Sequence, residues 1–315
     1  MRILLTGAAG FLGSHLTDRF LEQGHEVIGA DNFVTGREAN LAHLNGHPRF
    51  RLIRHNVIEP LDIQEPLDWV IHFASPASPP KYLQHPIDTL RVNGEGAFRL
   101  LELARRHGGR FFMASTSEVY GDPSVHPQSE TYFGNVNPTG PRSVYDEGNR
   151  YAEAMVAAFH RTYGMSTRIM RGFNTYGPRM DPEDGRVVSN FIRQALAGEP
   201  LTVYGDGSQT RSLQYVSDMV EAVTRLMQVE YCFPVNLGNP EEYTVLEIAQ
   251  LVKELTGSSS PIDFRPLPEE DPKKRRPDIS LASRLTGWKP VVPAREGLMI
   301  TIEYFRTLAG CELSG

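Results

Sequence analysis

Short apolar runs alternate with longer amphipathic stretches through the first half of the chain. The run Trp69-Val70-Ile71-His72-Phe73-Ala74 is apolar almost throughout, which is typical of a strand buried on both faces of a parallel sheet. Stretches in which apolar residues recur at helical spacing predict helices between such runs. The expected strands are 3–6, 26–30, 50–55, 69–74, 110–115 and 167–171, and the expected helices are 11–23, 86–107 and 143–163.

Strands that alternate with helices predict an α/β fold in which a doubly wound parallel sheet carries helices on both faces. The second half of the chain has a different pattern, with expected helices at 189–197, 217–228, 244–256 and 296–308. We expect this half to form a smaller α+β domain on the carboxyl edge of the sheet, beginning near Asn174.

Composition narrows the class of protein. The 315 residues are 40% hydrophobic and carry a net charge of −6, which disfavours a nucleic-acid or anionic-membrane surface. The two cysteines, Cys232 and Cys311, have no metal-ligand neighbours in sequence, so we expect no metal site. The first strand begins almost at once and no apolar run approaches membrane-spanning length. The expected location is the cytoplasm.

A glycine-rich turn follows the first expected strand. Gly7, Gly10 and Gly13 have the spacing Gly-x-x-Gly-x-x-Gly, and the next helix begins at Phe11-Leu12. Glycine permits the tight turn, the approach of a pyrophosphate and close helix–sheet packing. The amino end of the helix offers free N–H groups to the phosphates. This context predicts a dinucleotide site rather than a purely structural turn.

Asp31 ends the second expected strand, 18 residues after Gly13. A carboxylate at this place accepts hydrogen bonds from the adenosine ribose and repels a 2′-phosphate, which favours NAD over NADP. Arg37 lies close by and weakens that preference, but Asp31 is the stronger signal. The residues expected to surround the adenosine are Asn32, Phe33, Thr35, Gly36, Arg37, Asn56 and Val57.

The fifth expected strand ends in Ser115-Thr116-Ser117-Glu118. Ligands bind at the carboxyl ends of strands in a doubly wound sheet. Thr116 and Glu118 are two residues apart and would point to the same side of an extended chain. Tyr145 follows at the start of the next expected helix. We interpret Thr116, Glu118 and Tyr145 as a proton-transfer group.

These motifs together resemble the extended short-chain dehydrogenase/reductase superfamily and, within it, the UDP-glucuronate decarboxylase (UDP-xylose synthase) family. The resemblance runs nearly end to end. The segments that carry it are 75–80, 115–120, 126–130, 145–148, 173–180, 184–191, 201–211, 236–242 and 275–279.

The resemblance implies a reaction on a sugar nucleotide with tightly bound NAD. Tyr145, as tyrosinate, would take the proton of the sugar 4-hydroxyl while hydride leaves C4. Carbon dioxide would then leave C5, next to the new ketone, and reprotonation with return of the hydride would give UDP-xylose. Thr116 would orient the 4-oxygen, and Glu118 would assist proton movement near C5.

The resemblance also implies domains, contacts and an assembly. It implies a NAD-binding domain over 1–173, rejoined by about 213–238, and a nucleotide-sugar-binding domain over 174–315. It implies a homodimer that pairs through helices 86–107 and 143–163. Further cofactor contacts would be Phe73, Ala74, Thr175 and Arg186, and substrate contacts would be Ser75, Arg91, Asn174, Ser189, Tyr204, Arg211 and Arg275.

One position departs from the family pattern. Asn149 stands where the family has a lysine four residues after Tyr145, a spacing that places both on one helix face. A lysine would bind the nicotinamide ribose and lower the pKa of the tyrosine. Asparagine keeps a donor but brings no charge, so we expect slow oxidation with fold and ligand binding preserved. The asparagine is either an introduced change that traps substrate or a natural divergence, and the intact surroundings favour the first.

Three other functions stay open at this point. A UDP-glucuronate 4-epimerase would use the same cofactor and substrate without losing the carboxylate. A nucleotide-sugar 4,6-dehydratase carries Asp-Glu after the strand-end threonine, whereas this chain has Ser117-Glu118. A catalytically silent protein that binds NAD and a nucleotide sugar would account for Asn149.

Overall fold

The computed structural model describes residues 1–267 and 274–312, except for the side chains of residues 309–312. Its centre is a seven-stranded sheet in the order β11-β6-β5-β4-β1-β2-β3, and every pair of neighbours is parallel. The α/β class with a doubly wound parallel sheet is therefore confirmed. The strands are β1 (Arg2–Thr6), β2 (Glu26–Asp31), β3 (Phe50–Arg54), β4 (Trp69–His72), β5 (Arg110–Thr116), β6 (Thr167–Gly172) and β11 (Pro234–Leu237).

The strand order reverses direction between β1 and β4. Chain order runs outward from β1 through β2 to β3 on one side, and from β4 through β5 and β6 on the other. The connections that follow β1 and β4 therefore leave the sheet in opposite directions, which opens a crevice at the carboxyl ends of these two strands. This crevice is where the glycine turn after β1 and the segment after β4 meet.

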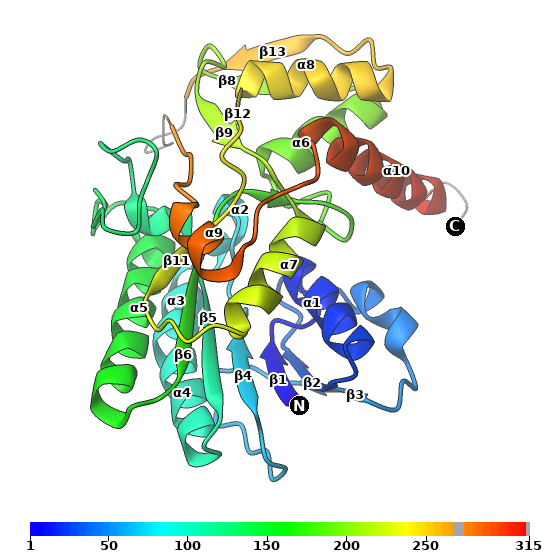
Figure 1. Ribbon diagram of the computed structural model, residues 1–315. Coiled ribbons are helices and arrows are strands. Elements are labelled where there is room, and N and C mark those ends of the chain that lie inside the picture. The colour runs from blue at the N-terminus through cyan, green and yellow to red at the C-terminus, as the bar shows by residue number, and fades with distance from the viewer. Residues whose placement is uncertain (268–273, 313–315) are drawn as a thin grey trace.

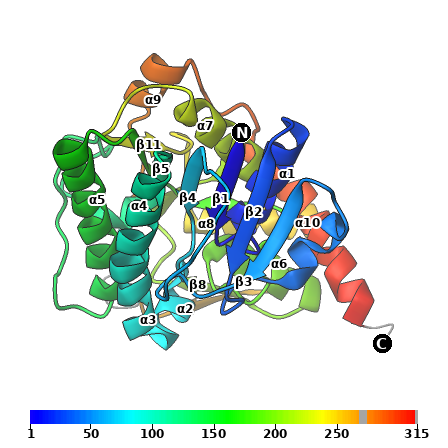
Figure 2. The same cartoon turned by 90° about the horizontal axis from the view of Figure 1, so that it is seen from below.

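Helices cover both faces of the sheet (Figures 1 and 2). On one face, α1 and α7 pack over a buried apolar cluster that includes Leu16, Phe20 and Met219, and on the other, α4 and α5 enclose a second cluster that includes Leu101 and Val156. Both faces of the sheet are thus removed from water, as its apolar strands predict. The helices on these faces are α1 (Phe11–Glu22), α3 (Pro86–Arg91), α4 (Ala97–Arg106), α5 (Ser143–Tyr163) and α7 (Val216–Met227).

The remaining elements gather above the carboxyl ends of the strands, at the top of Figure 1. The chain returns to the sheet through α7 and β11, so part of the second half completes the first, although the domain limits themselves stay a prediction. Within the described ranges, three small two-stranded sheets support this upper region. Its elements are β7 (Thr175–Tyr176), α6 (Val187–Ala197), β8 (Leu201–Tyr204), β9 (Thr210–Ser212), β10 (Gln214–Tyr215), β12 (Glu242–Thr244), α8 (Val245–Thr256), β13 (Ile262–Arg265) and α10 (Ala294–Glu312). Helix α9 (Ser280–Thr286) instead packs beside α7 and β11 (Figure 1).

Local signals set several helix ends. The side chain of Thr244 accepts a hydrogen bond from the Glu247 N–H, and the Glu247 side chain accepts one from the Thr244 N–H, which fixes the start of α8. The same helix ends at Gly257, whose φ of 69° suits a residue without a Cβ. None of the helices in the described ranges is long and apolar enough to cross a membrane.

The sequence-based helix at 86–107 is divided in the structure. A π-helical turn at Val92–Gly96 separates α3 from α4. Asn93 lies in this turn, and its amide donates to the carbonyl of Thr89 and to the hydroxyl of Ser75. The helical pattern was correct, but the extra residue in this turn turns Asn93 toward the segment after β4. The sequence analysis also did not anticipate α2 (Pro79–Gln84), α9 or strand β11.

Candidate active site

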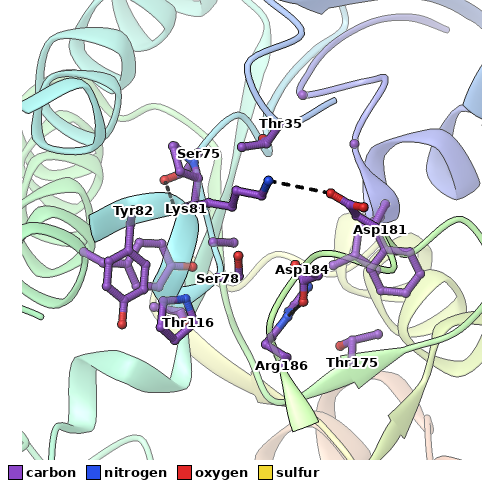
Figure 3. A pocket seen from close by; sticks show the side chains of 18 of the residues that line it. Thr35, Ser75, Ser78, Lys81, Tyr82, Thr116, Thr175, Asp181, Asp184 and Arg186 are labelled. Carbon is purple, nitrogen blue, oxygen red and sulfur yellow. Dashed lines mark hydrogen bonds and ion pairs between the residues drawn. The ribbon is translucent and has the colours of Figure 1, made fainter. Parts of the chain in front are cut away.

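A cavity of about 660 Å³ opens at the carboxyl ends of the central strands. Its walls come from the loops after β1, β2, β4, β5 and β6 and from the upper region, so both halves of the chain contribute. Figure 3 shows Tyr82 and Thr116 on one side of this cavity and Asp184, Arg186 and Thr175 on the other.

The glycine turn forms one end of the cavity. Gly7 has a φ of 73°, and a Cβ there would lie 2.7 Å from the backbone carbon of Phe73. A Cβ at Gly13 would overlap the carbonyl oxygen of Gly7. These two positions therefore require glycine for steric reasons, and the backbone of the turn stays accessible to a ligand.

Asp31 is held beside this turn by the backbone. Its Oδ2 accepts from the Ala9 N–H at 2.9 Å, and its Oδ1 accepts from the Phe33 N–H at 2.8 Å. Burial raises the pKa of the Asp31 carboxyl, and the hydrogen bonds from Phe33 and Ala9 oppose that rise. Each oxygen keeps a lone pair for a further donor, so the carboxylate is placed to bind a ribose hydroxyl.

Tyr145 enters the cavity from the first turn of α5. Its side chain is 7% exposed, and the side chain of Thr116 acts on its hydroxyl. Burial raises the pKa of Tyr145 to about 12, the negative charge of Glu118 adds to the rise, and Thr116 and Arg186 oppose it. The phenol is therefore protonated at neutral pH.

Glu118 lies next to this pair and is bound by two arginines. Arg142 Nη2 donates to Glu118 Oε2, and Arg275 Nη1 donates to Glu118 Oε1. Burial would raise the pKa of Glu118, but Arg275 and Arg142 outweigh it and lower the pKa to about 2. Glu118 is thus an anion with a cation on each side, and this group of three carries one net positive charge.

Asn149 shares the inner face of α5 with Tyr145 but does not reach the cavity. Its side chain is 1% exposed, and its amide donates to the carbonyl oxygen of Tyr145 at 2.9 Å. The neighbouring Arg150 donates to the carbonyl oxygens of Val119 and Phe133, so its guanidinium is engaged elsewhere. In the part of the chain that the structure describes, position 149 therefore brings no charge to Tyr145.

Most of the expected site residues line the cavity, although a lining position alone does not establish binding. The amide nitrogen of Asn174 is buried there without a hydrogen-bond partner among the described residues. The expected residues that line the cavity are Gly7, Gly10, Phe11, Leu12, Gly13, Asp31, Asn32, Thr35, Gly36, Arg37, Asn56, Val57, Phe73, Ala74, Ser75, Thr116, Glu118, Tyr145, Asn174, Thr175, Arg186, Tyr204, Arg211 and Arg275.

Four expected site residues do not line the cavity, and their roles stay a prediction. Arg91 lies on the exposed side of α3, where it pairs with Glu95 at 2.9 Å. The hydroxyl of Ser189 donates to the carbonyl of Arg186 within α6. Phe33 supplies its backbone N–H to Asp31, while its ring lies under the guanidinium of Arg54. The fourth is Asn149, whose side-chain amide donates a hydrogen bond to the carbonyl oxygen of Tyr145 in the same helix.

The sequence analysis missed several residues that the fold brings to the cavity. Arg142 precedes helix α5 and gives no spacing signal, and Lys81 and Tyr82 belong to the unanticipated α2. Lys81 Nζ lies 3.8 Å from Asp181 Oδ2 across the cavity (Figure 3). Other lining residues that were missed are Ser78, Arg179, Asp184 and Asn190.

The first end of the cavity fits a dinucleotide. Helix α1 has no acidic residue in its first turn and no side chain bonded at its amino end among the described residues. Its first N–H groups therefore remain for an anion. The glycine turn gives the phosphates access to the backbone. Asp31 lies at the end of the neighbouring strand β2, where its carboxylate can bind a ribose hydroxyl. These features are those of a nicotinamide-dinucleotide site.

Comparison with known families decides the class. Residues 3–238 match the family described as "NAD dependent epimerase/dehydratase family". The chain belongs to this family. The resemblance to UDP-glucuronate decarboxylases is confirmed as well. "UDP-glucuronic acid decarboxylase 1" of Danio rerio is 58% identical over 304 residues, which are 96% of this chain and 72% of the relative. The Arabidopsis thaliana protein of that name is 53% identical over 306 residues, 97% of this chain and 70% of that one.

Solved structures of the family have the same fold. UDP-glucose 4-epimerase of Thermotoga maritima with UDP-glucose has a TM-score of 0.90 at 31% identity, and covers 98% of this chain and 100% of its own. UDP-glucuronic acid 4-epimerase of Bacillus cereus, in complex with UDP-glucuronic acid and NAD, has a TM-score of 0.87 at 29% identity, with coverage of 98% and 100%.

Proposed function

We propose that this chain binds UDP-glucuronate and NAD and converts the substrate to UDP-xylose and carbon dioxide, slowly because of Asn149. The arrangement of Glu118 between Arg142 and Arg275, beside the Tyr145–Thr116 pair, carries the proposal. The relatives that are more than half identical to this chain are named as UDP-glucuronic acid decarboxylases, which supports it.

The charges on this wall of the cavity suit a sugar acid. Arg142 and Arg275 outnumber Glu118 by one, and burial excludes water that would screen the excess. A glucuronate carboxylate brings one negative charge, and guanidinium groups bind carboxylates with matched geometry. The buried donor of Asn174 and the guanidinium groups of Arg186 and Arg211 suit the diphosphate.

The reaction needs a group that holds charge on the sugar 4-oxygen. The carboxylate on C5 is β to the C4 ketone. When it leaves as carbon dioxide, the electron pair of the broken carbon–carbon bond moves onto the ketone oxygen and forms an enolate. The hydroxyls of Tyr145 and Thr116 interact. Each has one proton, so each can donate to that oxygen only in place of donating to the other. Glu118, with a pKa of about 2, stores no proton at neutral pH. Its role is then to hold Arg142 and Arg275 and to accept a hydrogen bond.

The ketone at C4 forms only when a coenzyme accepts hydride from the sugar. Bound NAD supplies the acceptor and donor of the hydride that interconverts alcohol and ketone at C4 of the sugar. The glycine turn and the amino end of α1 would hold its pyrophosphate, and Asp31 would hold its adenosine ribose. Tyr145 is the residue that removes the proton of the 4-hydroxyl and later returns it.

Asn149 limits the first of these tasks. A phenol with a pKa of about 12 is almost wholly protonated at neutral pH, so it is a poor base. A lysine in place of Asn149 would bring a cation to the same helix face as Tyr145 and lower its pKa. The amide of Asn149 is uncharged and donates its hydrogen bond to the Tyr145 carbonyl, so it does not lower the pKa of Tyr145 in this way. We therefore infer that binding is intact and that proton removal is slow.

Product analysis tests this function. The chain and its Asn149→Lys variant are incubated with NAD and UDP-glucuronate, and the nucleotide sugars are analysed by mass and chromatography. We expect UDP-xylose and carbon dioxide from both, with far more from the variant, and none from Tyr145→Phe. A product with the mass of the substrate would indicate a 4-epimerase instead. Binding without any product from the lysine variant would indicate a binding protein.

We also propose a homodimer. Helices α3, α4 and α5 present Ile87, Leu90, Phe98 and Tyr151 with exposed fractions of 41–65%, and a second copy of the chain would cover these apolar side chains. Light scattering should give twice the chain mass, and Ile87→Glu should reduce it to the monomer. The cytoplasmic location stays a prediction that cell fractionation can test.

A further inference from the structure

The segment 126–130 carries part of the family resemblance but does not line the cavity and takes no part in the reaction proposed above. Its central residue, Gln128, is completely buried. A buried amide needs hydrogen-bond partners for its oxygen and its nitrogen, because both have lost their contact with water. The partners of Gln128 therefore show what this segment holds in place.

Gln128 binds the residues that follow Arg275. Its side-chain oxygen accepts a hydrogen bond from the Arg276 N–H at 2.8 Å. Its own N–H donates to the Arg276 carbonyl at 2.9 Å, and its carbonyl accepts from the Asp278 N–H at 2.8 Å. The side-chain nitrogen donates to the Val125 carbonyl at 2.8 Å, which fixes the orientation of the amide. Gln128 thus fastens the backbone on the carboxyl side of Arg275.

Gln128 is itself fixed to the central sheet. Asn236 in strand β11 is fully buried, and its side-chain nitrogen donates to the Gln128 carbonyl at 3.0 Å and to the Asp278 carbonyl at 3.2 Å. The Asn236 side-chain oxygen accepts from the Tyr120 hydroxyl at 2.8 Å, and the Asn236 N–H donates to the Glu130 carboxylate at 2.9 Å. Asn236 therefore joins Gln128 and Asp278 to the hydrogen-bonded frame of the sheet.

Arg275 depends on this support because its own segment is irregular. Residues 274–279, all of which the structure describes, form no helix or strand, and an isolated β-bridge pairs Pro277 with Gln128. Arg275 is 4% exposed and donates to Glu118. An arginine side chain has many rotamers, so holding it in one place requires a fixed backbone beneath it. The hydrogen bonds of Gln128 supply that fixed backbone.

We propose that Gln128 is a positioning residue that sets Arg275 for the carboxylate of the substrate. Its side-chain oxygen fixes the backbone next to Arg275, and the guanidinium then lies beside Glu118, where the excess positive charge of the cavity is. This inference rests on the proposed function, because it concerns recognition of the glucuronate carboxylate. It predicts that Gln128 affects binding of sugar nucleotides with that carboxylate and not of those without it, a selectivity that a residue needed only for folding would not show.

Binding measurements on Gln128→Met and Gln128→Asn test the assignment. Methionine keeps the length of the side chain but removes its acceptor and its donor, and asparagine keeps the amide but is too short to reach the Arg276 N–H. Calorimetry should show UDP-glucuronate bound about 10-fold more weakly by each variant, because a hydrogen bond that orders Arg275 is lost. Binding of UDP-glucose, UDP and NAD should be unchanged. The two variants change packing differently, so either one tests the inference if the other does not fold.

A double-mutant cycle shows whether Gln128 acts through Arg275. Arg275→Met removes the guanidinium and should weaken UDP-glucuronate binding more than Gln128→Met does. Adding Gln128→Met to Arg275→Met should cause no further loss, because no guanidinium remains to be positioned. The matched control is Tyr132→Phe, which removes a hydrogen bond with the Ser124 N–H near Gln128 in the chain. That variant should bind UDP-glucuronate normally.

The outcomes that overturn the inference are distinct. Unchanged affinity of a folded Gln128 variant for UDP-glucuronate would remove it and leave the proposed function standing. So would an equal loss of affinity for UDP-glucose, UDP or NAD, which would show a general structural role. Losses that multiply in the double variant would mean that Gln128 acts on binding by a route other than Arg275. If the unmodified chain binds no UDP-glucuronate, the proposed function and this inference both fail.

Discussion

The two ends of the cavity are built in different ways. The coenzyme end comes from one continuous stretch, the glycine turn and its helix, with Asp31 one strand away, and its fit depends on the absence of side chains. The substrate end collects Glu118, Arg142 and Arg275 from segments far apart in the chain, and its fit depends on buried charges.

This difference separates steric from electrostatic recognition within one cavity. At the coenzyme end a single methyl group is the most damaging change, because backbone atoms occupy the space it would need. At the substrate end shape tolerates substitution better than charge does, because removing one partner leaves a buried ion unpaired. Substitutions at each end should therefore fail for different physical reasons, and the following predictions test that division.

The largest effect is expected for Gly13→Ala. Its Cβ would overlap the carbonyl oxygen of Gly7, so the turn and the amino end of α1 must shift away from each other. We expect NAD binding to be lost in calorimetry. The control is Gly46→Ala, where φ is 78° but no heavy atom lies within 4 Å. That variant should lose about 1 kcal/mol of unfolding free energy and bind NAD normally. Normal NAD binding by Gly13→Ala would contradict the steric account.

The next effect concerns charge at the substrate end. Asn149→Lys should raise the rate of carbon dioxide release at pH 7 by about 100-fold, because a nearby cation lowers the tyrosine pKa by about two pH units. In the unmodified chain the rate should rise about tenfold per pH unit between pH 7 and 9, since the pKa of Tyr145 is about 12 and its deprotonated fraction grows throughout. In the Asn149→Lys variant the rate should stop rising about two pH units lower than in the unmodified chain, because the pKa of Tyr145 is lower by that amount.

Asn149→Met is the matched control for this prediction. Methionine approaches lysine in length but has no charge and no donor, and it also breaks the hydrogen bond from Asn149 to the Tyr145 carbonyl. If methionine accelerates the reaction as much as lysine does, release of that hydrogen bond rather than charge explains the slow step.

A smaller effect is expected for Glu118→Gln, on stability. The folded pKa of Glu118 is about 2 and its ordinary value is 4.5, so its carboxylate stabilises the fold above pH 4.5. This contribution is lost as the pH falls from 4.5 toward 2. Glu118→Gln should cost about 3 kcal/mol of unfolding free energy at pH 7 and make stability less sensitive to acid. Denaturant unfolding between pH 2 and pH 7 measures both.

The control for Glu118→Gln is Glu183→Gln. Its side chain is 72% exposed and lies 3.6 Å from Arg193, so its loss should change stability little. If both substitutions change the pH dependence of the unfolding free energy equally, repulsion among all the positive charges at low pH, rather than the loss of the Glu118 contacts with Arg142 and Arg275, explains the loss of stability in acid.

The contrast between the two ends also explains what the sequence could predict. The glycine turn and Asp31 are contiguous signals with fixed spacing, and Thr116, Glu118 and Tyr145 stand at element ends that periodicity locates. Arg142 and Lys81 reach the cavity only through tertiary packing, which no local pattern records. Arg91 was expected at the site but lies outside the cavity lining. The sequence predicted its helix, but it did not predict the π-helical turn or which face of α3 is exposed.

The smallest effect concerns the ion pair that joins two walls of the cavity. Lys81 Nζ and Asp181 Oδ2 are 3.8 Å apart, and their side chains are 29% and 31% exposed. Such a pair contributes little, so Lys81→Met and Asp181→Asn should each speed NAD release only about 2- to 5-fold in stopped-flow displacement. If the pair acts as a unit, the double variant should release NAD as fast as either single one. Multiplied effects in the double variant would instead mean that each side chain affects coenzyme release separately.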